Sequence, residues 1–235
     1  MASVSATIEA LAGWRRAFVA IIAGVLWALA HVPFGVWPLI FVAGPLSFWL
    51  LRGGFRAGWL IGAVFFAITL HWIVEPFLID ATVFGWMAPF ALVGMAGGLG
   101  LFWAVAFWAA QRFFPGSAFG LAGCWFMAEA ARSYILTGFP WVLPAYIWVD
   151  TPVAQLSAMV GPYALSLITL VLAIAAFGLK RMSALASVAA VLAVSWVWGL
   201  YVLAAPEKGQ TLTVRVVQPN IPQAEKWAPE FQGRN

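Results

Sequence analysis

The chain is a succession of long apolar runs separated by short polar joints. The runs cover about residues 14–30, 37–51, 58–73, 83–110, 117–136, 153–179 and 184–204. None shows the alternation of polar and apolar residues that is typical of a transmembrane strand, and in lipid only helices and closed barrels satisfy the backbone. The pattern therefore predicts an all-α polytopic membrane domain with about seven transmembrane helices, over residues 1–205.

A different pattern begins after the last run. In Thr211–Val217 apolar residues alternate with polar ones until the last position, which is the period of a half-buried β-strand, and prolines then end the strand. A single strand is not stable alone, because its apolar face needs a sheet or a layer of helices. We therefore expect residues 211–235 to be only the start of a second, soluble domain that continues beyond Asn235.

Composition agrees with a membrane domain. The sequence is 64% hydrophobic and 9% charged, with a mean hydropathy of +0.96, whereas a soluble domain has about 25% charged residues. The net charge of +4 does not indicate a nucleic-acid partner, because the basic residues stand in short groups between the apolar runs.

These basic groups orient the domain. Every second joint carries them, at Arg15–Arg16, Arg52 with Arg56, Arg112 and Lys180–Arg181, while the joints at 31–36, 75–80 and 138–152 have neither Lys nor Arg. Since Lys and Arg concentrate in cytoplasmic loops, the N-terminus is predicted to be cytoplasmic and the segment after residue 204 to lie outside.

The first run has two interpretations. Arg15–Arg16 before an apolar stretch that ends in Ala28–Ala30 also fits a cleaved signal peptide. We expect a retained helix instead, because further apolar runs follow directly.

Small and aromatic residues predict how the helices pack. Glycines at four-residue spacing, Gly54, Gly58 and Gly62 and again Gly94 and Gly98, are expected to let helices approach closely. Several tryptophans fall near the predicted outer ends and are typical of an interfacial aromatic belt: Trp37, Trp72, Trp86, Trp141 and Trp148.

Two charges lie well inside a predicted helix. Glu129 and Arg132 are three residues apart, so they can pair on one helix face, and charges in lipid are costly and usually paired or functional. One interpretation is a structural ion pair that fastens this helix to its neighbours. The other is that Arg132 contacts a lipid headgroup, because the following Leu136–Trp141 forms a Gly- and Pro-containing loop that presents an indole at the outer surface.

Other reactive residues give weaker signals. His31 and His71 near outer ends are expected to be hydrogen-bonded interfacial residues, and the single Cys124 a buried, inert thiol. We expect no metal site and no cofactor, because no cluster of ligands and no phosphate-binding glycine loop can be assembled.

Several segments together resemble a known family. AEAARSYILTGFPW (Ala128–Trp141), the following Asp150–Pro152, VRVVQPNIPQAEKW (Val214–Trp227) and Gly58–Ile73 are similar to the apolipoprotein N-acyltransferases of Gram-negative bacteria, over nearly the whole chain. The resemblance implies a multi-pass domain of the bacterial inner membrane, followed by a periplasmic nitrilase-like (carbon–nitrogen hydrolase) α/β domain and a final span.

The resemblance also implies a reaction and its partners. The sn-1 acyl chain of a phospholipid is transferred to the α-amino group of the lipidated, diacylglyceryl N-terminal cysteine of an apolipoprotein, through a cysteine thioester with a glutamate base and a lysine at the oxyanion. Trp227 matches a tryptophan near the substrate site and Trp141 lies in the loop that faces it, so these two and Arg132 are the expected substrate- or lipid-binding residues, with Glu129 as a structural or lipid contact.

The same resemblance implies that the catalytic triad lies downstream of Asn235. We therefore expect no catalytic residue in this chain, and no activity of the chain by itself. The residues alone leave open a second function, that of a non-catalytic polytopic membrane protein such as a lipid-binding scaffold or a small-molecule transporter.

Overall fold

The computed structural model describes residues 2–135, 138–178, 182–205 and 215–218. This part of the chain is almost wholly helical and contains no β-strand. Its α-helices are α1 (Ala2–Ala10), α2 (Gly13–Ala30), α3 (Ile40–Trp49), α4 (Gly54–Thr69), α5 (Glu75–Leu78), α6 (Ala81–Phe84), α7 (Ala88–Phe113), α8 (Ala118–Arg132), α9 (Ser157–Gly178) and α10 (Met182–Ala204). Short 3-10 helices join them: η1 (Trp37–Leu39), η2 (Leu50–Gly53), η3 (His71–Val74), η4 (Gly85–Met87), η6 (Pro144–Trp148) and η7 (Pro152–Leu156).

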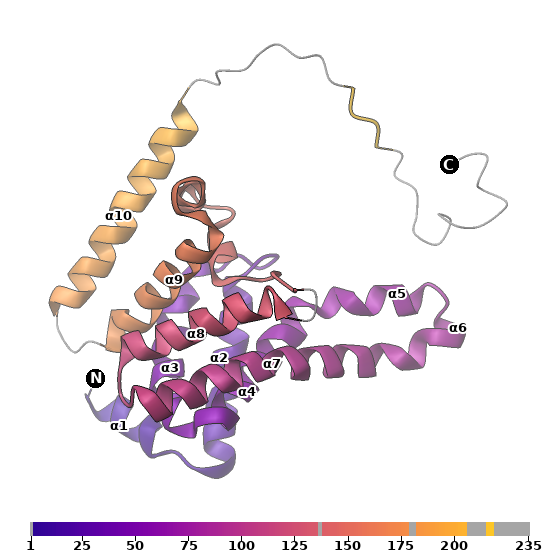
Figure 1. Cartoon of the computed structure of the whole chain (residues 1–235), viewed down its shortest axis with the longest axis horizontal. Helices are drawn as coiled ribbons and strands as arrows, with labels where there is room; N and C mark the ends of the chain where they lie inside the picture. The colour runs from indigo at the N-terminus through magenta and orange to yellow at the C-terminus, as the bar shows by residue number, and fades with distance from the viewer. Residues whose placement is uncertain (1, 136–137, 179–181, 206–214, 219–235) are drawn as a thin grey trace.

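The helices form a bundle around α4 and α7. α2 packs on α4, α8 packs on α7, and α9 lies against both α3 and α8. Figure 1 shows α5, α6 and the N-terminal part of α7 projecting from this bundle, and α10 standing at its edge. The centre holds an aromatic cluster, in which Trp125 contacts Trp27, Trp103 and Phe107 with ring centroids 5.3, 4.5 and 5.3 Å away.

Glycines on α4 make its contact with α7 possible. A Cβ added to Gly58 would lie 2.5 Å from the carbonyl oxygen of Trp103, and one on Gly62 would lie 3.0 Å from the Cα of Gly100. The predicted close approach is therefore confirmed at these two positions. At Gly94 and Gly98 it is wrong, because a Cβ there would meet no atom within 4 Å.

Each of the seven apolar runs overlaps one of the longer helices. Five stretches of the described residues, however, are long and apolar enough to cross a membrane: Gly13–Ala30, Trp37–Thr69, Ala81–Phe113, Pro152–Ile174 and Leu185–Ala204. The prediction of an all-α, multi-pass membrane domain is confirmed in this coarser form. The count differs for two reasons. α3 and α4 fall within one continuous stretch, and α8 has only 15 residues, fewer than the about 20 that span a bilayer core.

The soluble start predicted at residues 211–235 falls mainly outside the described residues. Residues 215–218 are described and have no regular secondary structure. The predicted strand over 211–217 and Trp227 therefore stay predictions.

The tryptophans of the expected aromatic belt divide into two groups. Trp72, Trp86 and Trp141 are 41%, 68% and 53% exposed, as residues of a membrane interface are. Trp148 is instead buried, and its indole N–H donates to Thr169 Oγ1 on α9 at 2.7 Å. Trp37 packs against Trp148 with ring centroids 5.4 Å apart, so this pair belongs to the packing of the bundle.

Candidate functional site

α8 carries one acidic and one basic residue, Glu129 and Arg132, and both side chains are buried. They form the ion pair that their spacing predicts, with Arg132 Nη2 donating to Glu129 Oε2. The second carboxylate oxygen, Oε1, accepts a hydrogen bond of 2.6 Å from the indole N–H of Trp103 on α7. Because both oxygens have donors, the pair joins α8 to α7 in the middle of the aromatic cluster.

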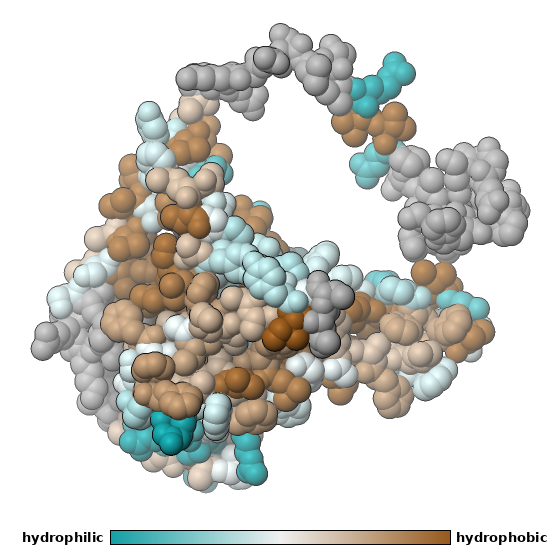
Figure 2. All heavy atoms as spheres, viewed as in Figure 1, coloured by the Kyte–Doolittle hydropathy of each residue, from teal (hydrophilic) through white to brown (hydrophobic). Residues whose placement is uncertain are grey.

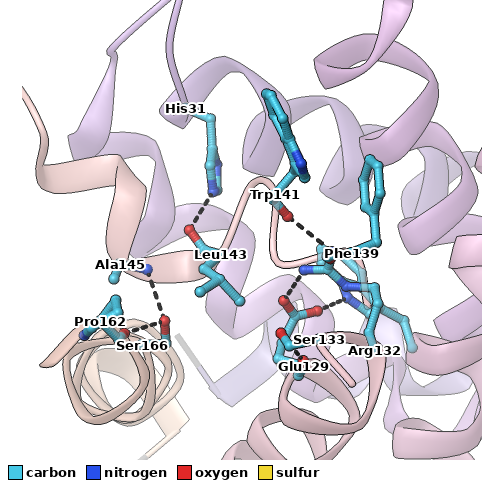
Figure 3. Close-up of polar contacts among 11 residues, drawn as sticks. His31, Glu129, Arg132, Ser133, Phe139, Trp141, Leu143, Ala145, Pro162 and Ser166 are labelled. Carbon is cyan, nitrogen blue, oxygen red and sulfur yellow. Dashed lines mark hydrogen bonds and ion pairs between the residues drawn. The ribbon is translucent and has the colours of Figure 1, made fainter. Parts of the chain in front are cut away.

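The guanidinium of Arg132 also holds the loop that follows α8. Its Nη1 donates to the backbone carbonyl oxygens of Phe139 and Trp141, the latter at 2.9 Å (Figure 3). In return, the backbone N–H of Phe139 donates to the carbonyl oxygen of Arg132 at 2.9 Å. The Cζ atom of the guanidinium lies over the ring of Phe66 on α4, 5.2 Å from its centroid. One buried cation therefore connects α8, α4 and the loop.

The loop can fold over α8 only because its backbone takes unusual conformations. Gly138 has φ +85°, and a Cβ there would lie 2.2 Å from the carbonyl oxygen of Ser133. Val142, at the other end, has φ +52°, which is strained for a β-branched residue. Such strain persists where the surroundings fix the chain, and it is frequent at functional sites.

Two indoles lie at the surface above this support. Trp141 and Trp72 of η3 are both partly exposed, and their ring centroids are 5.3 Å apart. Phe139 stacks on Trp141 from within the loop, with centroids 6.2 Å apart. The carbonyl side of the loop is thus bound to Arg132, while its aromatic side faces outward.

The segment after Trp141 is held by buried polar contacts. One ring nitrogen of His31, at the end of α2, lies 2.9 Å from the carbonyl oxygen of Trp27. The other lies 3.3 Å from the carbonyl oxygen of Leu143 (Figure 3). Further along, the backbone N–H of Ala145 donates to Ser166 Oγ of α9 at 3.1 Å. α2 and α9 therefore position the loop from the side opposite to Arg132.

His31 is buried, and this burial lowers its pKa to about 4, although the two carbonyl contacts oppose the shift. The ring is therefore neutral at pH 7. The predicted hydrogen bonding of His31 is confirmed, but its side chain lies inside the bundle instead of at an interface. His71 is exposed and its Nδ1 lies 2.9 Å from the carbonyl oxygen of Ile68, as expected of an interfacial histidine.

The structure thus brings together three of the residues that the sequence singles out: Glu129, Arg132 and Trp141. Their role at a substrate stays a prediction, as does that of Trp227. Sequence reasoning missed Trp103 as the partner of Glu129, since 26 residues separate them and no spacing rule connects α7 to α8. The pairing of Trp72 with Trp141 has one signal in the sequence, because the pattern predicts both residues at the same membrane surface.

The described residues offer little nucleophilic or metal chemistry. They contain no group of three or more His, Cys, Asp or Glu side chains that could hold a metal ion. Cys124 is a free thiol on α8, and it lines an apolar groove with Gly120, Gly123 and Met127. No hydrogen bond activates it within this part of the chain, so the site is suited to binding and positioning.

Comparison with known proteins gives the same family that the motifs suggest. Residues 23–175 match the model of the apolipoprotein N-acyltransferase N-terminal domain. Similar curated proteins are the apolipoprotein N-acyltransferases of Caulobacter vibrioides, 41% identical over 92% of this chain and 44% of the relative, and of Allorhizobium ampelinum, 34% identical over 96% and 47%. That of Rhodopseudomonas palustris is 34% identical over 90% of this chain and 44% of the relative.

The chain spans about half the length of these curated relatives, and its matched region contains the ion pair, the loop and the outer indoles. The family model covers residues 23–175 of the 235 in the chain, which is more than half. The chain therefore belongs to the apolipoprotein N-acyltransferase family.

Proposed function

We propose that this chain is the membrane portion of an enzyme that transfers the sn-1 acyl chain of a phospholipid to the α-amino group of the lipidated N-terminal cysteine of apolipoproteins. Its partners are then a phospholipid donor, a diacylglyceryl-cysteine acceptor and the bilayer of the bacterial inner membrane. Family membership supports the proposal, since the curated relatives bear the name of this activity.

The proposal includes seven membrane crossings. Trp37–Thr69 crosses twice in this scheme, and the turn between α3 and α4 at Gly54, which has φ +50°, supports this reading. α8 with the residues that follow it supplies the further crossing. The alternation of basic and non-basic joints then places the N-terminus in the cytoplasm and residues 211–235 in the periplasm.

The covalent chemistry is assigned to a nitrilase-like domain that starts at residue 211. In this assignment a cysteine there forms the acyl-thioester, a glutamate acts as base, and a lysine stabilises the oxyanion. Cys124 is an unsuitable nucleophile, because none of the described residues that line its apolar groove is a base. The chain as given is accordingly expected to be inactive, with Trp227 and the outer loop of the membrane domain contributing to the substrate site.

The role of the membrane domain in this scheme is to hold an aromatic platform at the outer surface. The observation that carries the proposal is the bonding of Arg132 to the carbonyls of Phe139 and Trp141, which fixes the loop from beneath. Trp141 and Trp72 are thereby presented at the level where phospholipid glycerol and upper acyl chains lie. We assign to these two indoles the contact with the donor phospholipid.

A complementation experiment tests this assignment. The full-length protein is expressed in bacteria depleted of their own N-acyltransferase, and N-terminal peptides of a lipoprotein are analysed by mass spectrometry for two or three acyl chains. Trp141→Ala and Trp72→Ala are expected to leave a large diacylated fraction, while Trp86→Ala, which changes another exposed tryptophan outside the pair, leaves the wild-type ratio. Wild-type ratios in both variants of the pair would reject the assignment, and absence of triacylated product with the unmodified protein would reject the function itself.

A further inference from the structure

A long apolar groove runs between α7 and α8 on the face opposite to the aromatic cluster. Its volume is about 1410 Å³. Its lining extends from Gly94 to Ala109 on α7, and from Ser117 along α8 to Ile135, just after the end of α8. At 1.5 Å per residue the α7 side is about 22 Å long. Figure 2 shows hydrophobic side chains dominating the surface over these helices.

Glycines on both walls keep this groove open. Gly94 and Gly98 on α7 and Gly123 on α8 all line it, and a Cβ added to any of them would meet no atom within 4 Å. Glycine inside a helix costs about 1 kcal/mol relative to alanine, and here no close contact between helices offsets that cost. The space beside the three glycines therefore has the shape of a binding groove.

The groove lies within the membrane domain, so its occupant must be apolar along most of its length. The volume exceeds the roughly 300–1,000 Å³ of ordinary ligand pockets, and the length is that of an extended chain. Its walls present exposed aliphatic and aromatic groups, among them Leu101, Val105, Phe119 and Met127. A lipid acyl chain has this shape and this polarity.

An exposed positive charge lies at one end of the groove, where it could bind a lipid headgroup. Arg112, in the last turn of α7, is exposed beside the groove residue Phe114 and makes no ion pair within the described residues, its guanidinium lying 5.6 Å from the centroid of Phe113. At the other end the cation near Ile135 is Arg132, which is buried and already bonded to Glu129. A phosphate group is therefore complementary to the Arg112 end.

We propose that the groove between α7 and α8 binds one phospholipid with its phosphate at Arg112 and its acyl chain along Gly123, Gly98 and Gly94. The Arg112 end is the cytoplasmic one in the proposed topology, so this lipid comes from the cytoplasmic leaflet. It is distinct from the acyl donor, which is assigned to the opposite surface. Its function is to complete the packing of the two helices that support the Glu129–Arg132 pair.

Native mass spectrometry of the full-length protein, released from mild detergent after washing, tests this. Wild-type protein is expected to retain one phospholipid. Gly98→Leu with Gly123→Leu adds volume inside the groove at two positions where a Cβ meets no atom within 4 Å, and this variant is expected to lose the lipid. Val93→Phe adds volume to an exposed position of α7 outside the groove lining and is expected to retain it.

The headgroup contact is tested in the same instrument with added phosphatidylglycerol. Arg112→Gln is expected to weaken binding about fivefold, the contribution of one basic side chain near a charged lipid surface, whereas Arg56→Gln, on the same side of the domain, leaves it unchanged.

Equal lipid retention by the wild type and the glycine double variant would overturn the proposal. So would the absence of bound lipid from the wild type. Lipoprotein acylation is measured in parallel, so that loss of the groove lipid and failure of the proposed function are seen separately.

Discussion

Replacing Arg132 by leucine removes a side chain that has two separable tasks. It neutralises the buried Glu129, and it donates to the carbonyls of Phe139 and Trp141. Without it, the Glu129 carboxylate keeps, among the described residues, the N–H of Trp103 as its one partner. Breaking a buried pair on one side costs about 3–5 kcal/mol, because a charge remains without compensation. Arg132→Leu is therefore expected to lower the free energy of unfolding by about this amount.

The double variant Glu129→Leu with Arg132→Leu separates the tasks. With both charges gone, we expect it to recover at least about 1 kcal/mol of the lost stability, since apolar replacements of a buried pair are often tolerated. The loop carbonyls still lack their donor, so acyltransferase activity should stay low. The stability of the full-length protein is measured by denaturant titration in mixed micelles, and its activity by lipoprotein acylation.

Arg52→Leu is the matched control. Arg52 pairs with Glu9 at 3.7 Å with 71% and 35% of the two side chains exposed, and a pair of this kind contributes less than about 1 kcal/mol. If Arg132→Leu were no less stable than Arg52→Leu, the buried pair would not support the bundle. If the double variant were fully active, the loop would not depend on the guanidinium.

Three further predictions concern the loop, a buried histidine and the topology. Gly138→Ala forces a methyl group against the backbone at the end of α8, so acylation activity should be lost while the helix content stays unchanged. Gly116→Ala is the control, because Gly116 also has a positive φ but an added Cβ there meets no atom within 4 Å. It should cost only about 1 kcal/mol of stability. The folded-state pKa of His31, about 4, lies below its unfolded value near 6.5, so the unfolded chain binds the proton first as the pH is lowered. The free energy of unfolding should therefore fall as the pH drops from about 6.5 to about 4, by up to about 3 kcal/mol. In thermal unfolding, His31→Gln should flatten this dependence of stability on pH. Reporter fusions at Lys180 and Gln210 should report opposite compartments, and equal signals would refute the proposed topology.

The sequence predicts what depends on local pattern and misses what depends on approach between helices. The apolar runs locate every long helix, and the three-residue spacing of Glu129 and Arg132 predicts their ion pair, because both signals lie within one segment. The donor from Trp103 could not be found this way, because it needs the distance at which α7 meets α8. The two helices α5 and α6, four residues each, are too short to produce a periodic signal.

Glycines illustrate the same limit. Gly58 and Gly98 stand in similar apolar contexts with four-residue partners, yet one touches a neighbouring backbone and the other borders open space. The four-residue spacing of glycines indicates that a helix face carries no side chains at these positions. Only the tertiary structure shows whether that face meets another helix or borders open space. The Glu129–Arg132 pair and the exposed Trp141 were thus predictable from the sequence, but the contacts that support them were not.

The crossing of α10 over η7 has a mechanical consequence. A Cβ on Gly199 would lie 1.9 Å from the carbonyl oxygen of Pro152, so the two backbones touch there, and Ser195, one turn earlier, is also buried. Ala204 lies five residues beyond this pivot, about 7.5 Å along the helix. Since η7 follows the segment that His31 and Ser166 contact, this backbone contact fixes the C-terminal part of α10 to the same part of the bundle that holds the outer loop.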